Sequence, residues 1–150
     1  MENSEIKQIL LVEDNLGDIR LIKEVFNYGK VPVNLNVVNN GVDAVSFLKR
    51  DTGFQDAPRP ELVILDLNLP KKNGKEVLAD IRSDKHLSNM PVIVLTSSEA
   101  ESDVQICKSL KIEHYYTKPM ELDKFVSVIE EIEDFLIENK NGDQPEPDNS

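Results

Sequence analysis

The sequence predicts an α/β fold in which five strands alternate with five helices around one parallel sheet. Short, unbroken apolar runs recur along the chain, and each run is followed by a segment whose apolar residues recur at helical spacing. An unbroken apolar run is typical of a strand that is covered on both faces, as the strands of a parallel sheet are. Five such units favour a flavodoxin-like three-layer sandwich with the strand order 2-1-3-4-5.

The strands are expected at residues 9–12, 35–38, 62–65, 92–95 and 114–117. Helices are expected at residues 19–26, 44–48, 77–81 and 122–136, and a further helix that begins near residue 98 separates the last two strands. Ser98 and Glu101 have the spacing of a capping box for that helix. Its first half, SEAESD, is polar, so we expect the helix to be poorly buried at its start.

Two segments do not follow the alternation of strands and helices. Residues 51–60, DTGFQDAPRP, have the composition of a loop that is longer than most connections in compact α/β domains. From Asn139 onward the sequence NKNGDQPEPDNS is polar and contains Pro and Gly, so residues 139–150 are expected to be a disordered acidic tail. The chain length then fits one folded domain at residues 1–138.

Charge and composition narrow the classes of partner and the expected location. The formal net charge of −11 disfavours binding to nucleic acid or to an anionic membrane surface. The N-terminus has no basic segment leading into an apolar one, and no apolar run approaches the roughly 20 residues that span a bilayer. We therefore expect a cytoplasmic protein. The single cysteine, Cys107, excludes an internal disulfide and is expected to be a buried small apolar residue.

Polar residues follow four of the predicted strands, each at the point where the strand ends. Glu13 and Asp14 come after the first strand, Asp66 after the third, Thr96 after the fourth and Lys118 after the fifth. The carboxyl ends of parallel strands lie at the same edge of the sheet, and ligands bind there, where the strand order reverses. We therefore expect three carboxylates, one hydroxyl and one ammonium to converge on one site.

The chemistry of these groups favours a divalent cation and a phosphoryl group. Carboxylates that lie close together raise one another's pKa and destabilise the fold, and a hard cation such as Mg²⁺, Mn²⁺ or Ca²⁺ removes the repulsion. A hydroxyl and an ammonium suit the oxygens of a transferring phosphoryl group, and a central carboxylate can be the nucleophile. The chain lacks the glycine-rich loops GxxxxGK[ST] and GxGxxG, which disfavours a nucleotide.

The segments ILLVEDN, LVILDLNLPKKNG, VIVLTSS and YYTKP resemble the motifs of two-component response-regulator receiver domains, from about Gln8 to Asn139. The resemblance implies that Asp66 accepts a phosphoryl group from a phosphohistidine on a sensor histidine kinase. It further implies that the domain then switches a partner-binding face, and that it is not an enzyme beyond its own phosphotransfer and dephosphorylation.

The resemblance also implies how Mg²⁺ is held. Asp14 and Asp66 would ligate the ion directly, Glu13 would act through water, and Asn68 would contribute its backbone carbonyl. Mn²⁺ or Ca²⁺ could substitute for Mg²⁺ in such an oxygen site.

Further roles are implied for the phosphoryl group and the switch. Thr96, Ser97, Lys118 and Asn68 would bind the phosphoryl oxygens, with Thr96 also acting in the switch. Tyr115 falls at the position of the family's switch aromatic, although Tyr116 beside it would take that position after a slip of one residue. The peptide bond before Pro119 would be cis.

Residues 51–60 and the segments DLNLPKKNGKEVL and VLTSSEAESD are similar to small stand-alone receivers paired with phytochrome-like or other sensory histidine kinases. After the last helix there is no room for a DNA-binding helix-turn-helix, so the downstream partner is expected to be an unknown protein. Small receivers of this kind often dimerise through the last helix region, and the resemblance allows a homodimer.

Two other functions stay open at this point. A haloacid-dehalogenase-like phosphatase also uses an aspartate nucleophile after a strand together with Mg²⁺. Such enzymes normally carry a second acid two residues later, where this chain has Asn68, and usually carry a cap domain. The other alternative is a degenerate receiver that acts only as a binding module and is never phosphorylated.

Overall fold

Five parallel strands form one sheet in the order β2-β1-β3-β4-β5, which confirms the predicted topology. The computed structural model describes residues 5–139, so the predicted tail, apart from Asn139, lies outside the described residues. The strands are β1 (Lys7–Val12), β2 (Val33–Val38), β3 (Leu62–Leu65), β4 (Val92–Thr96) and β5 (His114–Thr117). The helices are α1 (Leu16–Asn27), α2 (Gly41–Lys49), α3 (Gly74–Ser83), α4 (Glu101–Ser109) and α5 (Leu122–Glu138).

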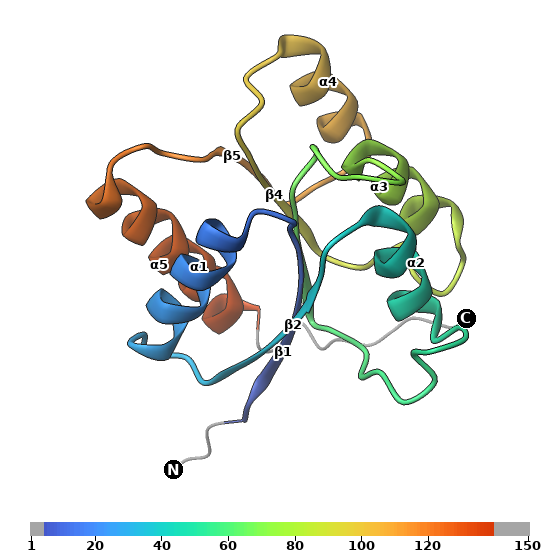
Figure 1. Ribbon diagram of the computed structural model, residues 1–150, viewed down its shortest axis with the longest axis horizontal. Coiled ribbons are helices and arrows are strands. Elements are labelled where there is room, and N and C mark those ends of the chain that lie inside the picture. Colours follow the sequence, from blue (N-terminus) through green and yellow to red (C-terminus); the bar gives the residue numbers. More distant parts are fainter. Residues whose placement is uncertain (1–4, 140–150) are drawn as a thin grey trace.

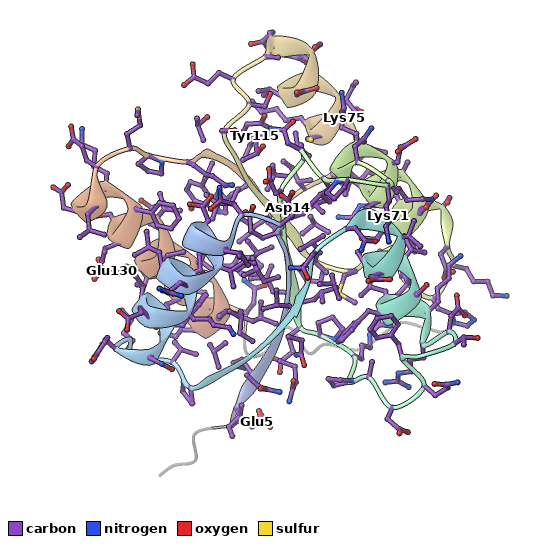
Figure 2. All side chains as sticks on the ribbon, viewed as in Figure 1. Glu5, Asp14, Lys71, Lys75, Tyr115 and Glu130 are labelled. Atoms are coloured by element: carbon purple, nitrogen blue, oxygen red, sulfur yellow. The ribbon has the colours of Figure 1, made fainter. Side chains whose placement is uncertain are left out.

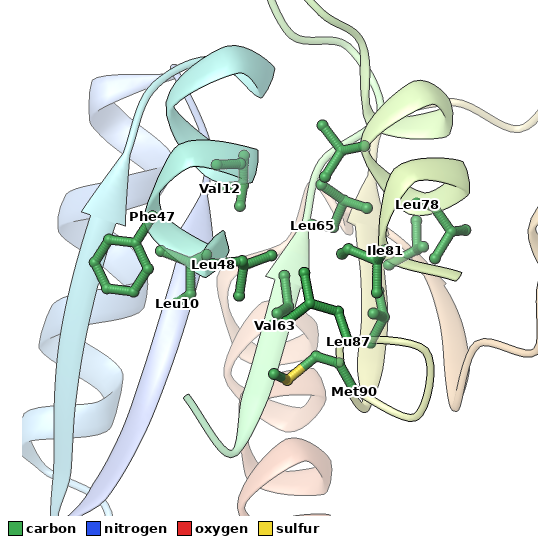
Figure 3. Packing of buried hydrophobic residues seen from close by; sticks show 14 of the residues in the cluster. Leu10, Val12, Phe47, Leu48, Val63, Leu65, Leu78, Ile81, Leu87 and Met90 are labelled. Atoms are coloured by element: carbon green, nitrogen blue, oxygen red, sulfur yellow. The ribbon is translucent and has the colours of Figure 1, made fainter. Parts of the chain in front are cut away.

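The helices cover both faces of the sheet, which gives the predicted three layers (Figure 1). Helices α1 and α5 lie on one face, and α2, α3 and α4 lie on the other. Strand β1 explains why the strands are unbroken apolar runs: Leu10 and Val12 pack toward α2 and α3, whereas Ile9 and Leu11 pack toward α1 and α5. Figure 3 shows the apolar layer between the sheet and helices α2 and α3, where Leu10 and Val63 lie against Phe47 and Leu48 of α2.

Helix α4 is the least buried helix in the described part of the chain, as its polar sequence predicts, and Cys107 is its one buried residue. The predicted capping box is wrong. The N-cap residue is Ala100, and its side chain has no group that can accept a bond from the helix. The hydroxyl of Ser98 instead donates to Asp103 at 2.6 Å and accepts from the Ala100 N–H at 3.3 Å. Ser98 therefore lies before the helix and is tied to its first turn.

Residues 51–60 form no regular helix or strand, as their composition predicts. No helix in the described part of the chain combines the length and the apolar character that crossing a bilayer requires.

Two glycines let the loop after β3 pack closely against its neighbours. A Cβ added at Gly74 would lie 2.3 Å from the Asp66 carbonyl oxygen, and one added at Gly41 would lie 1.9 Å from the Lys72 carbonyl oxygen. The Gly74 N–H also donates to the Leu67 carbonyl at 2.9 Å. Both contacts are with backbone, which has little freedom to move aside. The start of α3 therefore fixes the backbone of Asp66.

Gly74→Ala should lower the free energy of unfolding by about 1–3 kcal/mol, because the new methyl group overpacks the backbone at Asp66 and Leu67. Urea denaturation followed by circular dichroism measures the effect. Gly17→Ala is the matched control, since its Cβ would meet only the Asn15 side chain, at 3.3 Å. It should cost less than Gly74→Ala, because the atom that it meets is the end of a side chain and not backbone. Equal stabilities for the two variants would contradict the packing argument.

Candidate functional site

Two acidic segments meet where β1 and β3 end, at the edge of the sheet predicted from the sequence. Glu13 and Asp14 directly follow β1, and Asp66 directly follows β3. The Glu13 N–H donates to Val38 and the Asp66 N–H to Val12, each at 3.0 Å, so both backbones continue the hydrogen bonding of the sheet. The side chains of Glu13 and Asp66 are buried, whereas that of Asp14, which is labelled in Figure 2, is exposed.

The three carboxylates lie close enough together to hold one metal ion. One oxygen from each of Glu13, Asp14 and Asp66 lies within 4.8 Å of the others. An all-oxygen set of this kind suits a hard divalent cation. Two of the three groups are buried, and the third faces solvent, which leaves a side from which an ion can enter and water can complete its coordination. The chemistry of the donor set therefore fits a divalent cation.

The close approach of the carboxylates and their burial change the pKa of Glu13. Burial, and after it the charge of Asp66, together raise the pKa of Glu13 from 4.5 to about 7. Bonds from Lys118 and from the Asn15 N–H oppose this rise. Glu13 is thus held in a charged form only against a substantial penalty, which a bound cation would remove.

Lys118 supplies the positive charge that this site has within the described residues. Its ammonium contacts three carboxylates: Asp18 at 2.8 Å, Glu13 at 2.9 Å and Asp66 at 3.2 Å. Burial by itself would lower the pKa of Lys118, but the hydrogen bonds to Asp18 and Glu13 outweigh it, and the pKa is raised. In the resting site Lys118 is thus paired with three carboxylates.

The predicted phosphoryl-binding groups lie at the ends of β3, β4 and β5, and two of them, Asn68 and Lys118, bond the Asp66 carboxylate. Thr96, the last residue of β4, is fully buried, and its carbonyl accepts the Lys118 N–H at 2.7 Å. The Asn68 N–H donates to the Asp66 carboxylate at 3.2 Å, and the Asn68 side-chain amide donates to the Ser97 hydroxyl at 3.5 Å. The structure therefore brings together the residues that the sequence predicts.

The two neighbouring tyrosines of β5 face opposite layers. Tyr115 packs against the layer of α2, α3 and α4, and its hydroxyl donates to the Ser98 carbonyl at 2.9 Å. Tyr116 packs against the layer of α1 and α5, and its hydroxyl donates to Glu131 at 2.8 Å. Tyr115 is therefore the tyrosine that contacts the loop after Thr96. Burial raises the pKa of its hydroxyl.

An ion pair extends this contact to two helices. The Lys75 ammonium of α3 lies 2.7 Å from the Asp103 carboxylate of α4, and Asp103 accepts a second hydrogen bond from Ser98 at 2.6 Å (Figure 2). These two partners lower the pKa of Asp103. The loop between β4 and α4 is thus bonded to Tyr115 through its backbone and to α3 through Asp103.

One predicted feature is wrong. The described residues contain no cis peptide bond, so the bond between Lys118 and Pro119 is trans. The trans isomer of a bond before proline is lower in energy by about 0.5–1 kcal/mol unless its surroundings demand the other isomer. Lys118 reaches its three carboxylates from the trans arrangement.

Sequence reasoning missed Asp18 as a member of the site. The structure has Asn15 as the N-cap of α1, with its side chain accepting the Asp18 N–H at 2.9 Å. Asp18 lies in the first turn of α1, and this helix begins at the same edge of the sheet as the site because it directly follows β1. That placement was the available signal. Lys75 and Asp103 gave no such signal, because their pairing depends on how α3 and α4 pack.

Comparisons with known proteins agree on one family. A family model described as "Response regulator receiver domain" matches residues 9–130. Response regulator Rcp1 of Synechocystis is 40% identical over 137 residues, which cover 91% of this chain and 93% of that protein. The probable methanogenesis regulatory protein FilR2 of Methanothrix harundinacea is 34% identical over 130 residues, covering 86% of this chain and 83% of that protein.

Solved structures give the same result. The phosphorylated cyanobacterial phytochrome response regulator RcpA has a TM-score of 0.84 and 41% identity, over 89% of this chain and 95% of that chain. The Mn²⁺-bound form of Rcp1 has a TM-score of 0.83 and 39% identity, over 95% of this chain and 99% of that chain. The chain therefore belongs to the family of response-regulator receiver domains, which act in two-component signal transduction.

Proposed function

We propose that the chain is a stand-alone response regulator whose receiver domain occupies residues 1–138 and whose phosphoryl acceptor is Asp66. A sensor histidine kinase donates the phosphoryl group: the bond from phosphorus to the kinase histidine breaks, a bond from phosphorus to an Asp66 oxygen forms, and the imidazole leaves. The chain turns over no other substrate. The observation that carries this proposal is the fixed position of the buried Asp66 carboxylate between Lys118 and the Asn68 N–H.

The contacts of Asp66 support its role as the nucleophile. One carboxylate oxygen accepts the Asn68 N–H at 3.2 Å, and the other accepts from the Lys118 ammonium at 3.2 Å. These bonds orient the carboxylate before any donor arrives, so little reorganisation is needed for an in-line attack. The neighbouring groups Thr96, Ser97 and Lys118 supply donors for the phosphoryl oxygens, over which the charge of the transition state spreads.

We propose Mg²⁺ as the resident cation, held by Asp14 and Asp66 directly, by Glu13 through water and by the Asn68 backbone carbonyl. When bound, Mg²⁺ supplies positive charge to the phosphoryl oxygens. The carboxylate cluster and the raised pKa of Glu13 support an ion at this place, and Mn²⁺ or Ca²⁺ would fit the same oxygens.

The proposed output is a change of the surface formed by α4, β5 and α5. A phosphoryl group on Asp66 would recruit the Thr96 hydroxyl, which at present accepts the Ser98 N–H at 3.4 Å. Because Ser98 also bonds Tyr115 and Asp103, a shift of this loop would change how β5 and α4 pack. Such a change is a population shift between two packings. Tyr115, already partly buried against this loop, is the proposed switch residue.

The proposed donor is a phytochrome-like histidine kinase, because similar solved structures include a phytochrome response regulator and two bacteriophytochrome response regulators. The downstream partner is proposed to be a protein rather than a nucleic acid, since the net charge of −11 would repel a phosphate backbone. A homodimer through the region of α5 is part of the same proposal.

Incubation with acetyl phosphate and Mg²⁺ should add the mass of one phosphoryl group to the protein, and Asp66→Asn should abolish the addition, because the amide is not a nucleophile. Intact-mass spectrometry measures the adduct. Asp56→Asn, in the exposed 51–60 loop, is the control and should be phosphorylated normally. No adduct on the unaltered protein, with either acetyl phosphate or a phosphorylated kinase, would favour a receiver that acts only as a binding module.

Asp14→Asn should raise the melting temperature in EDTA, because it removes one of three mutually repelling carboxylates; the expected gain is about 0.3–1 kcal/mol at this exposed position. The same change should weaken Mg²⁺ binding by more than about tenfold, since mutating even a residue that only hydrogen-bonds to a metal ligand typically lowers metal affinity by that factor. Thermal melts with and without Mg²⁺ measure both effects. A lower melting temperature in EDTA would contradict the repulsion argument.

Tyr115→Phe should leave phosphorylation of Asp66 within about twofold of normal and reduce the accompanying amide chemical-shift changes in α4 and β5. The physical reason is loss of the bond from the hydroxyl to Ser98, which is worth about 0.5–1.5 kcal/mol. Tyr116→Phe is the matched control, because its hydroxyl bonds Glu131 on the other layer. Two-dimensional NMR before and after phosphorylation separates the two variants, and equal effects from both would argue against Tyr115 as the switch.

A further inference from the structure

We propose that Asp18 is a positioning residue that holds the Lys118 ammonium on the α1 side of the site and thereby keeps Glu13 and Asp66 available to a divalent cation. This inference rests on the proposed function, because it concerns the same cation and the same acceptor. It assigns a role to a residue that none of the recognised motifs contains.

Lys118 can donate one hydrogen bond to each of the three carboxylates around it. An ammonium has three N–H donors, and the three carboxylates of Asp18, Glu13 and Asp66 lie within 3.2 Å of it. They come from three parts of the chain: the first turn of α1, the residue after β1 and the residue after β3. The Lys118 side chain is only 12% exposed, so water has limited access to replace a partner that is lost. The three carboxylates therefore share the three donors and the single positive charge of one ammonium.

The position of Asp18 separates it from the metal-holding group. The carboxylates whose oxygens lie within 4.8 Å of one another are Glu13, Asp14 and Asp66, and Asp18 is not among them. Within the described part of the chain, the cation that the Asp18 carboxylate contacts is Lys118, at 2.8 Å. Asp18 therefore acts on the cation site through Lys118.

The consequence is a competition between Lys118 and the divalent cation. Both are attracted to Glu13 and Asp66, so an ammonium that pairs more tightly with these two carboxylates weakens the binding of the divalent ion. Asp18 makes the shortest of the three contacts, with Glu13 nearly as close, and Asp66 is the longest. Without the Asp18 charge, the ammonium would turn toward Glu13 and Asp66. The loss of the negative charge of Asp18 also weakens the attraction of the site for a divalent cation.

Asp18→Asn should therefore weaken Mg²⁺ binding by about three- to tenfold, as expected for the loss of one partly buried ion pair. Isothermal titration calorimetry without any phosphodonor measures the affinity. Glu24→Gln, an exposed change on the same helix, removes the same charge without touching Lys118 and should change the affinity by less than about twofold.

Repeating the measurement in a Lys118→Gln variant distinguishes an effect of Asp18 that acts through Lys118 from a general effect of its charge. In Lys118→Gln, the change Asp18→Asn should have less than about a twofold effect, because the residue through which Asp18 acts is gone. A full effect in that background would overturn the proposal in favour of a simple charge effect. An Asp18→Asn protein that binds Mg²⁺ as tightly as the unaltered protein would also overturn it.

A spectroscopic measurement keeps the test valid if Lys118→Gln does not fold. The ¹³C–¹⁵N correlation of the Lys118 ammonium should shift in Asp18→Asn and stay unchanged in Glu24→Gln; an unchanged Lys118 signal in Asp18→Asn would contradict the proposal. Failure of the proposed function is recognised separately, because the unaltered protein would then bind no Mg²⁺, or would bind it equally well after Asp14→Asn.

Discussion

The pairing of the partly buried Lys118 ammonium with three carboxylates holds the charged groups of the site together. The topology of the sheet brings Glu13 and Asp66 to neighbouring strand ends, where burial and mutual repulsion oppose their charged forms. Lys118 compensates for part of this repulsion from the end of β5, and Asp18 joins it from α1. The site is nevertheless left with more negative than positive charge. That imbalance is what attracts a divalent cation, so the electrostatic cost in the folded protein and the proposed metal affinity have one physical origin.

The packing of the fold fixes this cluster with little freedom. The backbones of Glu13 and Asp66 continue the hydrogen bonding of the sheet, and the strands beneath them are buried on both faces. Gly74 then allows α3 to begin against the Asp66 carbonyl. A carboxylate held by strand, loop and helix together needs little reorganisation, which is what the proposed role of Asp66 as phosphoryl acceptor requires.

The route from the acceptor to the surface runs through one short loop. Ser98 accepts from Tyr115 through its backbone, and through its side chain it bonds Asp103, which pairs with Lys75. Helix α4 has one buried residue, Cys107, so its position depends more on these polar contacts than on apolar packing. A small displacement near Thr96 can therefore move α4 without disturbing the core, which would keep the signal separate from the stability of the domain.

The architecture and the main members of the site follow from the amino-acid sequence alone. Unbroken apolar runs alternate with helical spacing, and this pattern together with the rule for ligand sites in parallel sheets is enough to bring Glu13, Asp14, Asp66, Thr96 and Lys118 together. Such reasoning works because strand ends in a parallel sheet have only one edge at which to meet.

Only the tertiary structure decided which groups pair within that edge. Lys118 and Asp18 are 100 residues apart, and Lys75 and Asp103 are 28 apart, so no local pattern predicts either contact. The capping box at Ser98 and the cis bond before Pro119 were wrong for a related reason. A local motif states what a segment prefers by itself. The choice between a helix cap and Asp103, or between two isomers before a proline, is made by the charges and backbone that the fold brings alongside.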